Sequence, residues 1–78
     1  MHDKYQFQFN AKAIIEHFGG LEETTRALNE MGSTVTFKAV EKMRFRNMMQ
    51  SDVLATLMAW SAHKGITLDP YEFLAERK

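Results

Sequence analysis

The sequence predicts a mostly α-helical fold: four to five short helices around one core, with residues 5–9 as a candidate N-terminal β-strand. Three observations predict it. Apolar residues recur at helical spacing along most of the chain. Capping residues precede these segments, and glycines follow them. With 78 residues the chain forms a single domain, and because a chain this short buries only about 60% of its unfolded surface, we expect self-association.

Composition limits the class of protein. The chain is 45% hydrophobic, which suits a folded core and not a disordered tail. It has no cysteine, which excludes disulfides and thiolate metal sites and fits the reducing cytoplasm, where we expect the protein. No apolar run approaches the roughly 20 residues that span a bilayer. We therefore expect no membrane association.

The N-terminal pattern has a period of two. Tyr5, Phe7 and Phe9 alternate with glutamines, which predicts a short strand with one apolar face. An arm that covers the core is the alternative. Because a lone strand leaves its backbone groups unpaired, a strand here must pair with another segment or with a second copy of the chain.

Helices are expected over residues 11–18, after an N-cap at Asn10, and over residues 21–31, before Gly32. A fourth helix should run from a cap at Ser51 to about residue 64. The pair Asp69-Pro70 should start a final short helix over residues 70–76. Residues 1–9 and 66–78 hold apolar side chains beyond those that the central helices need, so both are candidate dimerisation or covering segments.

The third expected helix, residues 37–46 after a cap at Thr36, differs from the others in charge. Its inward face comprises Ala39, Val40 and Met43. It carries four of the ten basic residues against one acid, Glu41; the four are Lys38, Lys42, Arg44 and Arg46. A small helical domain that presents a cationic helix after a turn has the layout of a helix-turn-helix DNA reader.

The formal net charge is zero, which counts against nucleic-acid binding, because such domains are usually basic. The distribution of charge along the chain, in contrast, favours nucleic-acid binding. A local basic face on a neutral protein still supplies phosphate contacts, although its long-range field is weaker. We therefore expect modest non-specific affinity for DNA and reliance on dimerisation.

Several short motifs lie between Ile14 and Leu74. They are Phe18-Gly19-Gly20, Ala27-Leu28, Gly32, Val40 and Met43 followed by Arg44 and Arg46, Ser51-Asp52-Val53-Leu54, and the run from Gly65 to Pro70. Together they resemble small phage and prophage Cro/repressor-type helix-turn-helix proteins. The chain departs from that family at Met43, where Trp is usual, at Met49-Gln50, where Ile-Pro is usual, and in a longer turn before the third helix.

The resemblance implies a homodimer that binds double-stranded DNA and represses transcription, with its third helix in the major groove. Residue by residue, it places the groove-facing positions at Thr36, Phe37, Lys38, Glu41 and Lys42, and the phosphate-facing end of the helix at Arg44 and Arg46.

Alternatives remain for individual residues. Thr24 and Thr25 either contact phosphate, together with the N–H groups at the start of their helix, or lie partly buried. Phe37 either touches a thymine methyl group or folds onto the core, and we favour the core. Glu41 either accepts from cytosine or forms an intrahelical ion pair.

We expect no enzymatic activity and no metal or other cofactor. The three histidines lack metal-ligand spacing, and no catalytic motif is present. The alternative function is that of an antitoxin or phage accessory protein whose main partner is another protein; a purely structural interaction module is also open. Met48-Met49 is the candidate exposed pair for such a partner, although filling the core is the favoured role.

Overall fold

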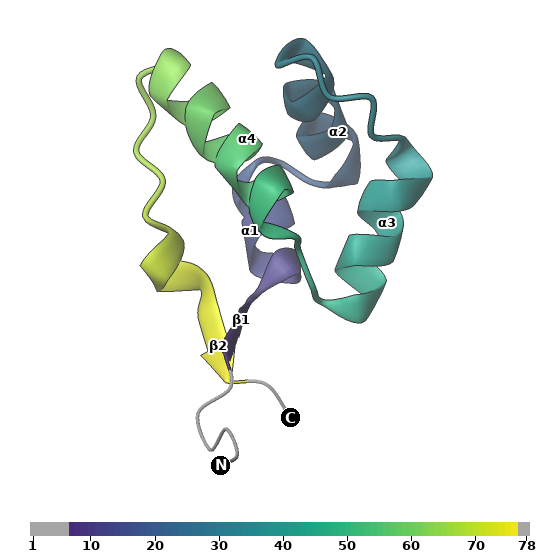
Figure 1. Ribbon diagram of the computed structural model, residues 1–78, viewed down its shortest axis with the longest axis vertical. Helices are drawn as coiled ribbons and strands as arrows, with labels where there is room; N and C mark the ends of the chain where they lie inside the picture. Colours follow the sequence, from purple (N-terminus) through teal and green to yellow (C-terminus); the bar gives the residue numbers. More distant parts are fainter. Residues whose placement is uncertain (1–6, 77–78) are drawn as a thin grey trace.

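The computed structural model describes residues 7–76. Its elements, in chain order, are β1 (Phe7–Phe9), α1 (Ala11–His17), α2 (Leu21–Glu30), α3 (Phe37–Arg46), α4 (Ser51–His63), a 3-10 turn η1 (Pro70–Phe73) and β2 (Leu74–Glu76). The mostly α fold is confirmed. In Figure 1, α1 lies at the centre, α3 forms one side, α4 forms the other, and the two strands lie below the helices.

Side-chain caps set where three of these elements begin. Asn10, Thr36 and Asp69 each accept a hydrogen bond from a backbone N–H in the turn that follows, at 3.0–3.1 Å. The predicted cap at Ser51 is wrong. Ser51 is the first residue of α4, and Gln50, which has an extended backbone and no side-chain cap bond, precedes it.

The predicted helix over residues 70–76 is also wrong in its second half. Helical structure stops at Phe73, because Leu74–Glu76 pairs with Phe7–Phe9 as an antiparallel two-stranded sheet, in the register Phe7↔Glu76 and Phe9↔Leu74. The pairing satisfies backbone groups that a frayed helix end would leave to solvent. Both candidate dimerisation segments therefore pair with each other inside one chain. Tyr5, and the rest of residues 1–6 and 77–78, lie outside the described residues.

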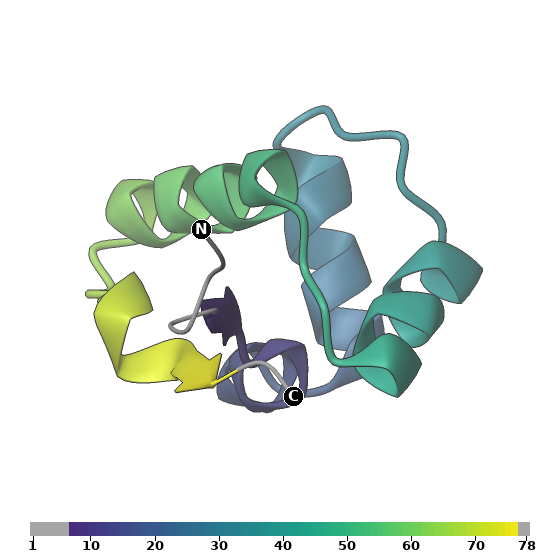
Figure 2. The same cartoon turned by 60° about the horizontal axis from the view of Figure 1, so that its bottom comes forward.

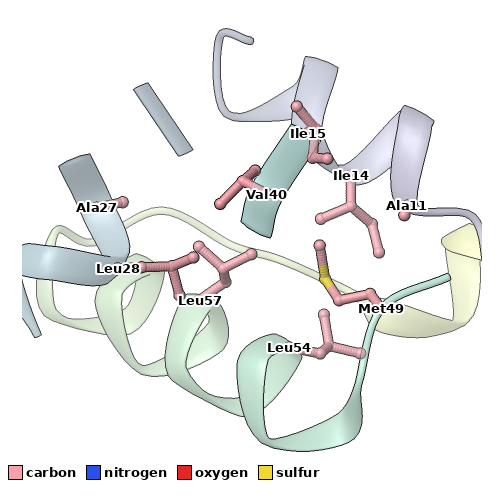
Figure 3. Close-up of a cluster of buried hydrophobic side chains, with 9 residues drawn as sticks. All are labelled: Ala11, Ile14, Ile15, Ala27, Leu28, Val40, Met49, Leu54 and Leu57. Carbon is pink, nitrogen blue, oxygen red and sulfur yellow. The ribbon is translucent and has the colours of Figure 1, made fainter. Parts of the chain in front are cut away.

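The core draws on all four helices described. Its buried side chains are Ala11, Ile14, Ile15, Ala27, Leu28, Val40, Met49, Leu54 and Leu57. Figure 3 shows them pointing toward one another from α1, α2, α3, α4 and the loop before α4. Two methionines of the helical region, Met31 and Met58, are exposed. Met58 directly follows Leu57, and consecutive helical residues leave the helix in different directions.

A polar contact joins α2 to α4 at the surface. Trp60 Nε1 donates to Glu30 Oε1 at 2.8 Å, and Lys64 Nζ lies 3.7 Å from the same oxygen. The Trp60 hydrogen bond, followed by the charge of Lys64, lowers the pKa of the Glu30 carboxyl. Because the folded state favours the ionised carboxylate, this contact stabilises the fold above the ordinary glutamate pKa. The stabilisation is lost as the pH falls through the lowered pKa.

We expect Trp60→Phe to raise the pKa of Glu30 toward its ordinary value, because the substitution removes the largest cause of the shift. An NMR titration of the Glu30 side-chain carboxyl carbon measures this directly, whatever packing the smaller ring loses. Lys64→Gln should also raise the pKa of Glu30, because the lysine charge is the second cause of the shift. An unchanged Glu30 pKa in Trp60→Phe would contradict the assignment.

Candidate nucleic-acid interface

Residues 31–36 connect α2 to α3, and this connection is longer than the 3–4-residue turn of the tightest helix-turn-helix motifs. Asn29 stabilises it. Its Nδ2 donates to the carbonyls of Ser33 and Val35, at 3.0 Å each. Gly32 has a φ of 91°, a left-handed conformation that favours glycine after a helix end. The longer turn is thus an ordered connection that fixes the start of α3, and sequence reasoning did not identify the role of Asn29.

One side of α3 faces the core. Val40 is fully buried, and Ala39 and Met43 are half-buried, which confirms the predicted inward face. The opposite side carries Lys38 and Lys42 one turn apart. In Figures 1 and 2, α3 lies at one edge of the molecule, and no other described segment covers its outer side.

The structure leaves all seven candidate residues of α3 and its cap exposed. They are Thr36, Phe37, Lys38, Glu41, Lys42, Arg44 and Arg46. Within residues 7–76, ion pairs join Arg26 to Glu23 and Lys64 to Glu30, and none involves α3. Glu41 therefore does not form the intrahelical pair considered from the sequence. We call this cationic surface, formed by Lys38, Lys42, Arg44 and Arg46, the basic face.

The start of α2 does not extend the basic face. The proposed phosphate contact of Thr24 is wrong: its side chain is fully buried, and Oγ1 donates to the carbonyl of Ile15 at 3.3 Å. Thr25 is half-buried and donates its only hydroxyl proton to the carbonyl of Leu21 at 2.8 Å. Exposed Glu22 and Glu23 occupy the first turn, where their charge repels phosphate. The basic face is therefore confined to α3.

Two phenylalanines of α3 are also exposed. Phe37 is 45% exposed and lines an open hollow beside α2, so the favoured placement of Phe37 in the core is wrong. Phe45 is 86% exposed. Helical spacing places Phe45 on or beside the outward face of α3, and its exposure confirms that position.

Asn47 ends α3, and its role was not predicted from the sequence. Its φ of 54° is left-handed, a conformation that asparagine tolerates better than most residues. Its Oδ1 accepts from the backbone N–H of Lys12 at 3.0 Å, and its carbonyl accepts from Gln8 Nε2 at 2.6 Å. The end of α3 is thereby fixed to the start of α1 and to β1.

We expect Asn47→Ala to destabilise the fold by about 1–2 kcal/mol, because one lost hydrogen bond costs about 1 kcal/mol and alanine tolerates the left-handed region less well than asparagine. Asn47→Gly should cost about 1 kcal/mol, since glycine removes only the side-chain bond. Urea denaturation of the three proteins measures both values. Equal losses in the two variants would show that the left-handed backbone contributes nothing.

The two methionines after α3 have different environments. Met49 is in the core, as favoured, whereas Met48 is 45% exposed. Met48 lines an open groove of about 570 Å³ between the α2–α3 connection, α3 and the start of α4. The groove residues include Val35, Met43, Met49 and Val53, with Lys42 and Arg46 on the α3 side and Asp52 on the α4 side.

Two other kinds of feature are absent from the part of the chain that the structure describes. No group of three or more His, Asp or Glu residues there could hold a metal ion, and no helix there has the length and apolar character needed to cross a membrane. No protein family, curated protein or solved structure matches the chain. The functional proposal therefore depends on the residues and their geometry.

Proposed function

We propose that the protein is a sequence-specific, double-stranded DNA-binding transcriptional regulator of the Cro-like repressor type, which acts as a homodimer on an operator. One observation carries the proposal. The basic face of α3 is exposed, and no ion pair neutralises it within residues 7–76. Neutralising phosphates with such cations releases counterions, which drives binding.

The side chains of α3 support two kinds of contact. Lys38 and Lys42, on the side opposite the buried Val40, can donate to guanine O6 and N7 in the major groove, and Glu41 can accept from cytosine N4. Arg44 and Arg46, at the end of the helix, can bind the phosphate backbone. Base contacts provide specificity, and phosphate contacts fix the position of the helix.

Dimerisation fits the size of the chain and the small number of basic residues that one copy presents. In a dimer, the two α3 helices should be about 34 Å apart to enter successive major grooves, so the operator should be a palindrome with half-sites about one helical turn apart. The outer edges of the two-stranded sheet are the candidate contacts, because the sheet contains β1 and β2 alone among the described residues.

Binding of the purified protein to its own upstream intergenic DNA tests the proposal. We expect competitor-resistant binding against random-sequence DNA and a steep loss of affinity as salt rises. Light scattering on the same complex gives the number of copies bound. No binding at about 50 mM salt, where electrostatic contacts are strongest, would overturn the DNA-binding function.

A protein partner is the second candidate function, and the groove beside Met48 favours it. Flexible methionines adapt to varied partners, and the two cations against one acid favour an acidic segment. Because Lys42 and Arg46 belong to both the groove and the basic face, such a partner would compete with DNA. Purification of the tagged protein from its host tests this candidate: a stoichiometric acidic partner, lost in Met48→Glu and retained in Met58→Glu, is expected.

A further inference from the structure

We infer that Phe45 determines part of the sequence specificity by contacting the 5-methyl group of a thymine in the major groove. The inference depends on the proposed DNA-binding function, and it names a feature that the operator must contain. Phe45 is the most exposed of the large hydrophobic residues described, at 86%. It belongs to a helix whose other exposed residues are mostly charged.

The position of Phe45 on α3 supports a base contact. Lys38, Lys42 and Phe45 follow one another at i, i+4 and i+7 spacing on the side opposite Val40, so all three share the outermost line of the helix. Arg44 and Arg46, the two flanking residues, leave the helix on either side of Phe45. With both guanidinium groups at phosphates, the ring between them would face base edges.

The chemistry of the ring selects one base-edge group. Phenylalanine has no hydrogen-bonding atom, so it cannot use the donors and acceptors that distinguish the base pairs. The thymine methyl is the apolar group exposed in the major groove, and side chains that read it are apolar. The four cations around Phe45 favour a polyanionic partner, which supports DNA over an apolar protein surface.

Helix geometry predicts where that thymine lies. Lys38 and Phe45 are seven positions apart in the sequence, which is about 10.5 Å along a helix. Base pairs are about 3.4 Å apart. If α3 lies along the groove, the thymine should therefore be about three base pairs from the pair that Lys38 contacts, once in each half-site.

Thymine-to-deoxyuridine replacement tests the contact, because it removes only the methyl group. The tightest site selected from random duplexes by the intact protein is resynthesised with one thymine replaced at a time, and Kd is measured by fluorescence anisotropy for wild type, Phe45→Ala and Met58→Ala. Met58 is the control, because it is an exposed apolar residue that lies outside α3 and outside both candidate dimerisation segments. Circular dichroism checks that each variant is folded.

For wild type and Met58→Ala, we expect replacement at one thymine per half-site to weaken binding about four-fold, the factor that corresponds to the burial of one methyl-sized group. Phe45→Ala should bind the unmodified site more weakly than wild type does, and replacing that thymine by deoxyuridine should weaken its binding no further. Identical replacement profiles in wild type and Phe45→Ala would overturn the inference alone. Loss of dimerisation in Phe45→Ala, seen by analytical ultracentrifugation, would assign the ring to the contact between copies instead. Absence of any DNA binding would overturn the DNA-binding function with it.

Discussion

Replacing Lys38 and Lys42 together by alanine is expected to weaken operator binding by between about 30-fold and about 20,000-fold. A base-contacting lysine contributes about 1–3 kcal/mol, and each 1.4 kcal/mol is a factor of ten in affinity. Both side chains are exposed on the outermost line of α3 and make no ion pair within the described residues. The fold should therefore survive the double substitution, and a salt titration by fluorescence anisotropy measures the loss.

Lys12→Ala is the matched control for this experiment. Lys12 is also an exposed helical lysine, but it belongs to α1, so its removal should change affinity by no more than a small electrostatic increment. Arg46→Ala should lower the salt slope by about one without changing the preferred sequence, as expected for a phosphate contact. If the double variant regulates and binds as wild type does, α3 is not the recognition helix, and the structural interaction module becomes the leading interpretation.

Leu57→Ala is expected to cost about 2–5 kcal/mol of the free energy of unfolding. Leu57 is fully buried in the core between α4 and the other helices. At roughly 0.05–0.15 kcal/mol per residue, a chain of 78 residues has only about 4–12 kcal/mol in total. The substitution should therefore remove a large share of the free energy of unfolding. Urea denaturation followed by circular dichroism measures the change.

The neighbouring Met58 provides the control, because it lies on the same helix and is exposed. Met58→Ala should cost less than about 1 kcal/mol, within the range of surface substitutions. A cost for Met58→Ala equal to that of Leu57→Ala would mean that α4 presents a different face to the core from the one described.

Local patterns predicted most of the helical framework. The limits of α3 match the expected residues 37–46, and the caps at Asn10, Thr36 and Asp69 are all confirmed. These features depend on spacing and on hydrogen bonds between residues close in the chain, so one segment of sequence contains the information that specifies them.

Contacts between distant residues were the source of the errors. The predicted helix over residues 70–76 ends early because Leu74–Glu76 finds a strand partner more than sixty positions away. Thr24 shares a helical stripe with Ala27 and Leu28, and only the packing of α1 against α2 shows that its hydroxyl is buried against Ile15.

The candidate site also combines features that the local sequence determines with features that depend on tertiary packing. The sequence by itself determined that α3 is a capped helix with four cations and one buried side, because charge content and helical period are properties of the segment alone. Only the tertiary structure decided that no other described segment covers the basic face, and that the Thr24 hydroxyl is buried against Ile15. Exposure depends on which segments pack over a residue, and that is set by the whole chain folding together.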